Sequence, residues 1–263
     1  MRQFVSPLLA LAFVGGLNTV STAAPAQRID LQPDHVGAIS VDDEVLNFRL
    51  FDHTQEKSLS DDDLLTASSN HPADLAMVVF DAGLDEFQHL SPEFTSEHWS
   101  TKVHFSRAGK YQIWLQGTLA IEHLQFQTIT PLTVTGGLPE NSAPPHLKEL
   151  RTATDADTKL TLSTTGIRAE HVARLTATIA HSDGSSQSLS SELNCKAAET
   201  PPFAIAVSAS GLDVRSLEIE AGADPEHFTL KVLLPKPVFY RLWIEFTEGC
   251  QVRRFPLVLL ANR

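Results

Sequence analysis

The chain repeats itself at long range, and this feature constrains its fold more than any other. Shifted by 129 residues, the segment 98–117 (HWSTKVHFSRAGKYQIWLQG) aligns without a gap on 227–246 (HFTLKVLLPKPVFYRLWIEF). The chain has only two tyrosines, Tyr111 and Tyr240, and they fall in register, as do a histidine, a lysine, a valine and a tryptophan. One long repeat predicts two homologous units rather than a solenoid of short repeats.

Within each unit, apolar and polar residues alternate with a period of two, which is typical of strands with one buried face. The alternating apolar positions include Tyr111, Ile113 and Leu115 in the first unit and Leu242 and Ile244 in the second. Turn signals separate many such short segments. The pattern predicts an all-β chain of two tandem antiparallel β-sandwiches, immunoglobulin-like or cupredoxin-like, of about 100 residues each.

In each repeat, two strands flank a turn rich in glycine or proline, at 107–109 and at 235–237. This arrangement predicts a β-hairpin in each unit. The strand after the turn carries the tyrosine, so we expect Tyr111 and Tyr240 to be core or corner residues whose hydroxyls bond backbone acceptors.

The matched tryptophans, Trp114 and Trp243, fall on the polar face of their strands. Aromatic side chains at equivalent outer positions allow two interpretations. They form a patch for a partner, or they are buried where the two sandwiches meet. The second interpretation is the one we expect.

The chain begins with a segment typical of a secretory signal. Arg2 precedes an apolar stretch from Phe4 to Leu17, and small residues follow at Ala24 and Ala26. The apolar stretch is shorter than the roughly 18 residues of a membrane span, and no later segment comes close. We therefore expect a signal peptide at 1–26, no membrane span, and a periplasmic or secreted protein.

Composition places the other boundaries and excludes some partners. The segment 137–146 is rich in proline and is the expected linker between a first domain at 27–136 and a second at 147–263. After signal removal, 19 bases stand against 32 acids, a net charge of −13, and the first domain carries −11 from 17 acids and 6 bases. Nucleic acid is an unsuitable partner for such a surface, because phosphate binding needs clustered cations.

Three segments together resemble a known group. They are the apolar run 75–80 (LAMVVF), the segment 84–93 (LDEFQHLSPE), and the start of the Tyr111 strand (GKY). This pattern resembles a poorly characterised family of exported bacterial tandem β-sandwich proteins that carry a His-x-His-Pro-Glu signature followed by a Gly-x-Tyr-x-x-Trp hairpin. The resemblance covers most of the chain as a pattern and implies a metal site, with copper as the associated metal.

The signature is degenerate here, since His89, Pro92 and Glu93 remain but Ser91 stands in place of the second histidine. A site built from His89, Asp74 and His71 is chemically suited to zinc or copper, because imidazole and carboxylate are ligands for both. The alternative is that these residues now serve structure or face solvent.

Cys195 and Cys250 are the only cysteines, and in an exported protein they predict a disulfide.

No nucleophile elbow, P-loop, dinucleotide fingerprint or zinc-protease motif occurs, so we expect no enzymatic activity. The sequence predicts a non-enzymatic exported binding protein of the bacterial envelope, with a degenerate copper or zinc module as one form of it. The alternative is a structural or adhesive envelope protein that acts through protein–protein contacts. An unknown protein or a metal ion is the expected partner.

Overall fold

The computed structural model describes residues 28–34, 39–65, 75–137, 145–164, 166–182, 202–222, 226–248 and 250–263. Nearly all regular structure in these ranges is β, with one short 3₁₀ helix at Asp61–Asp63. The first unit contains β1 (Ile29–Pro33), β2 (Ile39–Ser40), β3 (Asp42–Asp52), β4 (Lys57–Leu59), β5 (Ala76–Asp81), β6 (Phe87–Leu90), β7 (Glu93–Thr95), β8 (His98–Phe105), β9 (Gly109–Thr118) and β10 (Gln125–Thr135). The second contains β11 (Thr152–Asp155), β12 (Thr158–Ser163), β13 (Val172–His181), β14 (Phe203–Ser208), β15 (Val214–Ser216), β16 (Glu218–Ala221), β17 (His227–Leu233), β18 (Phe239–Glu248) and β19 (Gln251–Leu260).

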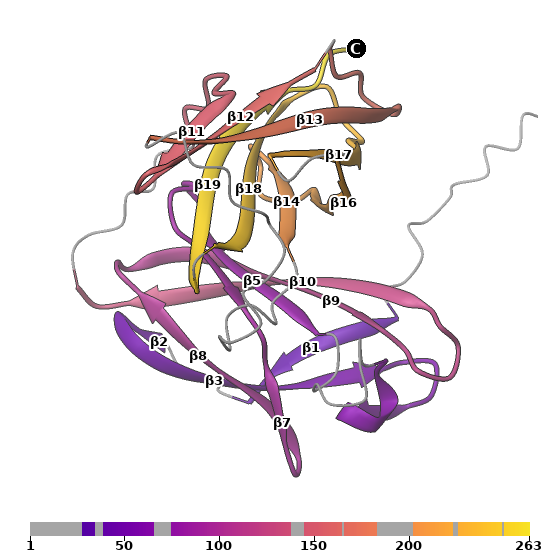
Figure 1. Cartoon of the computed structure of the whole chain (residues 1–263). Coiled ribbons are helices and arrows are strands. Elements are labelled where there is room, and N and C mark those ends of the chain that lie inside the picture. Colours follow the sequence, from indigo (N-terminus) through magenta and orange to yellow (C-terminus); the bar gives the residue numbers. More distant parts are fainter. Residues whose placement is uncertain are drawn as a thin grey trace, which may run out of the picture.

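Each unit is a sandwich of two sheets (Figure 1). In the first unit one sheet has the order β1-β3-β8-β7, with β4 beside β3, and the other has the order β2-β10-β9-β5-β6. In the second unit the orders are β11-β12-β13-β17-β16 and β15-β14-β18-β19. The strands β1, β3 and β5 to β10 therefore match β12 to β19 one by one, in chain order and in sheet partners.

This connectivity is that of an immunoglobulin-like sandwich, in which the first, second, fourth and fifth strands of the seven-strand pattern share one sheet and the third, sixth and seventh share the other. An extra strand, β6 or β15, extends the second sheet next to β5 or β14. The predicted all-β fold of two immunoglobulin-like sandwiches is confirmed. In the described part of the chain, no helix is long and apolar enough to cross a membrane.

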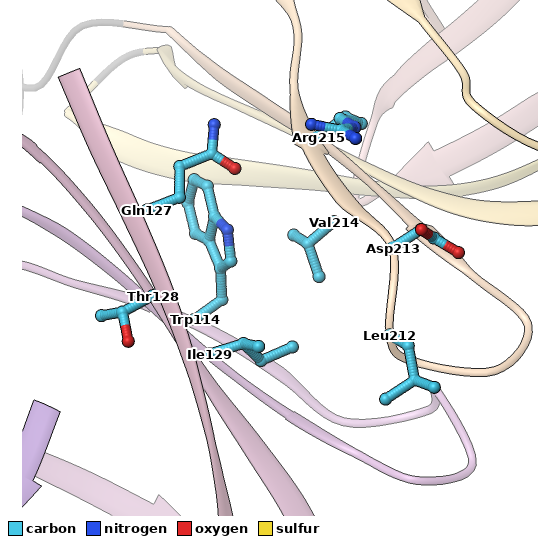
Figure 2. Close-up of a pocket in the computed structure, with 8 residues that line it drawn as sticks. All are labelled: Trp114, Gln127, Thr128, Ile129, Leu212, Asp213, Val214 and Arg215. Atoms are coloured by element: carbon cyan, nitrogen blue, oxygen red, sulfur yellow. The ribbon is translucent and has the colours of Figure 1, made fainter. Parts of the chain in front are cut away.

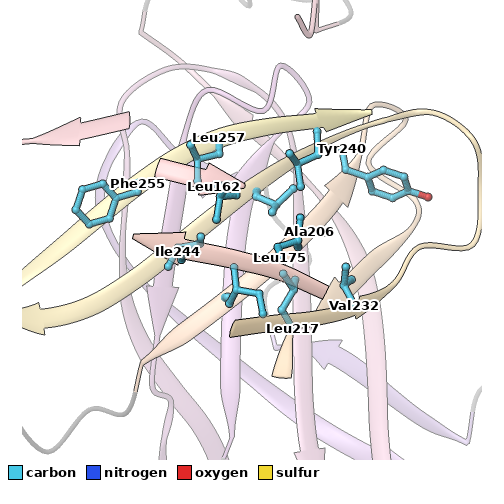
Figure 3. Packing of buried hydrophobic residues seen from close by; sticks show 14 of the residues in the cluster. Leu162, Leu175, Ala206, Leu217, Val232, Tyr240, Ile244, Phe255 and Leu257 are labelled. Carbon is cyan, nitrogen blue, oxygen red and sulfur yellow. The ribbon is translucent and has the colours of Figure 1, made fainter. Parts of the chain in front are cut away.

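The period-two pattern explains each core. Along β13, buried and exposed residues alternate, with Ala173, Leu175, Ala177 and Ile179 facing the second core. Figure 3 shows this core, where side chains from both sheets of the second sandwich meet. The first core is built in the same way around Trp99 and the apolar positions of β3, β5, β8 and β9.

The predicted hairpins are wrong. The strands on either side of each turn, β8 with β9 and β17 with β18, lie in different sheets and do not pair. β8 pairs with β3 and β7, whereas β9 pairs with β5 and β10. Alternation reports which face of a strand is buried, and both strands bury a face in the same core. It does not report whether the chain turns back within a sheet or crosses to the opposite one.

The tyrosine prediction is confirmed at these crossings. Tyr111 and Tyr240 are 1% and 0% exposed. The Tyr111 hydroxyl lies 3.0 Å from the carbonyl oxygen of Arg107, and the Tyr240 hydroxyl lies 3.2 Å from that of Lys236, four residues upstream in each case. Each hydroxyl thus ties its strand to the chain crossing before it, as a tyrosine corner does in immunoglobulin-like domains.

Candidate functional site

A third apolar cluster joins the two sandwiches. Its buried members from the first domain are Val78, Phe80, Leu84, Phe87 and Trp114, and those from the second are Ile205, Val207, Val214 and Trp243. They come from β5, β6, β9 and the turn after β5 on one side, and from β14, β15 and β18 on the other. The outer faces of two equivalent sheets therefore pack on each other, as the strands of the two domains show where they meet in Figure 1.

The paired tryptophans are central to this interface. Trp114 and Trp243 are each 2% exposed, so the prediction that they are buried between the sandwiches is confirmed. The Trp243 ring stacks on Phe87 of the other domain at a centroid distance of 4.6 Å and approaches Phe80 at 6.4 Å. The Arg254 guanidinium lies 5.1 Å from the centroid of the Phe87 ring, so this ring is in contact with two side chains of the second domain.

His89, the predicted metal ligand, lies on β6 within this interface. Its Nδ1 atom is 3.0 Å from Oε2 of Glu245, and its ring stacks on Phe203 at 3.8 Å. Glu245 also accepts a hydrogen bond of 2.6 Å from Arg254. The side chains of His89 and Glu245 are only 12% and 6% exposed, so the pair is largely shielded from solvent. His89 thus connects the two domains.

The other predicted site residues cannot be placed beside it. Asp74, His71 and Cys195 lie outside the described residues. Within the described ranges, no three histidine, cysteine, aspartate or glutamate side chains are grouped as a metal site. The three-residue metal site stays a prediction, and the contact of Nδ1 with Glu245 leaves Nε2 of His89 as the ring nitrogen that such a site would use. Cys250, between β18 and β19, is disulfide-bonded, and its pairing with Cys195 also stays a prediction.

A second polar contact crosses the interface at Arg241 on β18. Its Nε atom donates a hydrogen bond of 3.0 Å to the carbonyl oxygen of Leu84, and its guanidinium lies 3.6 Å from Asp85. Burial lowers the pKa of Arg241, and the nearby carboxylates of Asp85 and Asp81 act against that change. The contact satisfies a turn carbonyl of the first domain with a side chain of the second.

An acidic side chain supports the first domain near the interface. Glu86 lies 2.7 Å from the Tyr111 hydroxyl and 2.6 Å from Nε of Arg107, and it also accepts from Ser106. Burial alone would raise the pKa of Glu86, but the hydrogen bonds from Ser106, Tyr111 and Arg107 hold it below its ordinary value. The same surroundings raise the pKa of Tyr111, chiefly through burial and the bond to Glu86.

A pocket of about 320 Å³ opens at the edge of the interface. Figure 2 shows the residues that line it: Trp114, Gln127, Thr128 and Ile129 from the first domain, and Leu212, Asp213, Val214 and Arg215 from the second. An aromatic ring, several aliphatic groups and a few polar groups together are typical of a ligand site between domains. We refer to it as the seam pocket.

The sequence contains a signal for this interface beyond the tryptophans. In β5 the five consecutive residues from Met77 to Asp81 are buried, and in β14 the five from Ala204 to Ser208 are buried. A continuous apolar run in a short strand is typical of a strand covered on both faces. Arg241 and Glu245 are each two positions from Trp243, so they share its strand face and could be expected at the interface. No pattern in the sequence indicates Phe203 or Arg254 as interface residues.

Comparisons with known proteins identify no relative by sequence, since neither a protein-family profile nor a curated protein matches the chain. Among solved structures, a chimeric titin Z1Z2 functionalized with a KLER exogenous peptide from decorin shares 13% identity, with 90% of this chain and 98% of that chain covered and a TM-score of 0.22. The fibronectin(III)-like modules of Clostridium thermocellum CbhA share 11% identity, with 89% and 94% covered and a TM-score of 0.22. Domains 4 and 5 of the S-layer protein SbsC share 10%, with 89% and 98% covered and a TM-score of 0.24. The fold assignment rests on the sheet order and the tyrosine corners rather than on these matches.

Proposed function

We propose that this chain is an exported, non-enzymatic protein of the bacterial envelope that acts by contacting other proteins. Its two sandwiches work together as one rigid binding or structural module. The observation that carries this proposal is the interdomain interface, where equivalent sheet faces bury both outward tryptophans.

The interface supports rigidity in two ways. Stacked aromatic rings supply a large apolar contact, and the Phe87–Trp243 pair contributes about 0.5–1.5 kcal/mol beyond burial. The His89–Glu245 and Arg241–Leu84 contacts then fix the orientation, because a shift of either domain would leave largely buried polar groups without partners. Such a module holds its outer sheets and loops at fixed separations, which suits contact with large partners.

His89 connects the two domains, and this contact supports protein contact as the function. Metal binding through Nε2 would need further ligands around the same point, and none is grouped with His89 among the described residues. The His89 ring is stacked on Phe203 and its Nδ1 atom faces Glu245. A structural role accounts for both contacts without an ion.

Photocrosslinking in the organism that makes the protein tests the proposal. The photoreactive residue benzoylphenylalanine replaces, one at a time, large apolar side chains that are exposed and need no core contact. These positions are Val45, Ile121, Val172, Leu212, Leu233 and Val252.

We expect at least one of these positions to give a discrete crosslinked adduct with another protein. We also expect the measured mass of the exported chain to correspond to a protein without residues 1–26. A photoreactive residue at Arg263, which is exposed at the end of the chain, serves as the matched control for random capture. Equal, diffuse labelling from all positions and from the control would contradict a protein-binding role. Recovery of the chain in the cytoplasm with its first residues intact would contradict export.

A further inference from the structure

The seam pocket has the indole N–H of a largely buried tryptophan in its wall. Trp114 is 2% exposed, and Figure 2 shows the nitrogen of its indole ring on the side that faces Val214. No hydrogen bond from this N–H is present among the described residues. The core tryptophan of the first domain, Trp99, does donate, to the carbonyl oxygen of Leu59 at 3.1 Å. Trp114 Nε1 is not among the fully buried atoms without a partner, so its N–H opens to the pocket, where it can donate a hydrogen bond to a ligand.

The free charge of the pocket is positive. Asp213 is already paired, since Nζ of Lys236 lies 2.9 Å from its carboxylate. Arg215 is exposed and makes no ion pair or hydrogen bond with the described part of the chain. Arg215 and the indole N–H of Trp114 both line the pocket, and neither has a partner among the described residues, which favours an acidic ligand.

The rim of the pocket favours a peptide over a small acid. Leu212 lines the pocket and is 67% exposed. A small ligand held inside the pocket would leave this side chain in solvent, whereas a peptide lying across the opening would cover it. β15 is also the last strand of its sheet. The bonds from Ser208 N to Asp213 O and from Leu217 N to Ala204 O fix the register of β15.

That register leaves backbone groups for a partner. In an antiparallel pair, residues alternate between bonding the neighbouring strand and facing away from it. Val214 lies opposite Val207 at a position whose N–H and C=O point away from β14, to the side of β15 that carries no further strand of this sheet, and the residue is 6% exposed. An extended peptide can pair with such an edge through its main chain, while pockets beside the edge select its side chains.

We propose that the seam pocket binds an extended acidic peptide segment of a partner protein. A Glu or Asp carboxylate of the peptide pairs with Arg215. A hydrogen-bond acceptor of the same segment accepts from the indole N–H of Trp114, and a neighbouring apolar side chain of the peptide packs on Leu212. This inference rests on the proposed protein-binding function and names the partner chemistry at one site.

The test follows the indole N–H signals of the intact mature protein by NMR, with the Trp114 signal assigned from the Trp114→Phe variant. The probes are three peptides, acetyl-Leu-Glu-Leu-amide, acetyl-Leu-Gln-Leu-amide and acetyl-Leu-Lys-Leu-amide, together with the free acid 4-methylvalerate. We expect the Glu peptide to shift the Trp114 signal and to bind at least tenfold more tightly than the Gln and Lys peptides. The variant Arg215→Gln should remove that preference.

Arg174→Gln is the matched control, because Arg174 is an exposed arginine on the opposite sheet of the same sandwich and pairs with Glu220. The Arg174→Gln variant should keep the same preference for the Glu peptide as the unaltered protein. Equal binding of all three peptides, a preference that survives Arg215→Gln, or binding of 4-methylvalerate alone would overturn the inference. Crosslinks from other surfaces together with a silent Trp114 signal would refute the peptide site and leave the protein-binding function standing.

Discussion

Truncating Trp243 to alanine should separate the two domains without unfolding either one. The side chain lies on the outer face of β18, in the interdomain cluster rather than in the core of the second sandwich. Truncation of a buried tryptophan costs about 3–5 kcal/mol. Because the lost contacts are with Phe80 and Phe87 of the other domain, most of this cost falls on docking. A loss of about 3 kcal/mol lowers the ratio of docked to separated domains by more than a hundredfold.

Small-angle X-ray scattering and chemical unfolding measure this effect together. We expect Trp243→Ala to increase the radius of gyration and to resolve unfolding into two transitions, one for each sandwich. Trp99→Ala is the control, since Trp99 is equally large and 0% exposed but lies in the core of the first domain. It should destabilise that domain without increasing the separation of the folded domains.

A Trp243→Ala protein with an unchanged radius of gyration and a loss of stability below about 1 kcal/mol would refute the reasoning. That result would mean that the apolar contact between the sheets contributes little to the docked arrangement. A Trp243→Ala variant in which the second domain is unfolded would also contradict this prediction, because Trp243 is not a member of the core cluster of the second domain.

Three further predictions concern single side chains. Tyr240→Phe should cost about 1–3 kcal/mol in denaturant unfolding, because it removes the bond to the carbonyl of Lys236, and a cost near zero would show that the corner is dispensable. His89→Ala should also cost about 1–3 kcal/mol, since Glu245 loses one partner in the interface, whereas no loss of stability would argue against a structural role. Glu86 has a folded-state pKa below its ordinary value of 4.5, so its stabilising effect is complete above that value and is lost as the pH falls through the folded pKa. Thermal melts of Glu86→Gln should therefore fall less steeply below pH 4.5 than those of the unaltered protein, and parallel curves would contradict this assignment.

Much of the fold follows from local pattern. Alternation within β9 and β18 indicates which residues face the core, and the matched tyrosines indicate two equivalent units whose corners the structure confirms. Alternation cannot identify sheet partners, because a chain that crosses between sheets and a chain that turns back bury the same residues. The same residues therefore predict the strands correctly and the hairpins wrongly.

The interface was predictable only in part. Two tryptophans on polar faces indicate a covered surface, and the continuous burial along β5 and β14 agrees with it. The partner of His89 is 156 residues away along the chain, and no local spacing connects it to Glu245. The resemblance therefore indicates a metal ligand at His89, whereas the described contacts of this residue arise from the packing of one domain on the other.

A rigid interdomain interface requires that the two sandwiches tumble in solution as one body. Residual dipolar couplings of backbone amides, measured by NMR on the mature protein in a dilute aligning medium, report the orientation of each domain separately. A rigid module predicts that one alignment tensor fits the couplings of both domains with the orientation seen in Figure 1. Two tensors of different magnitude would show that the domains move independently, and would contradict a rigid module joined through Trp114 and Trp243.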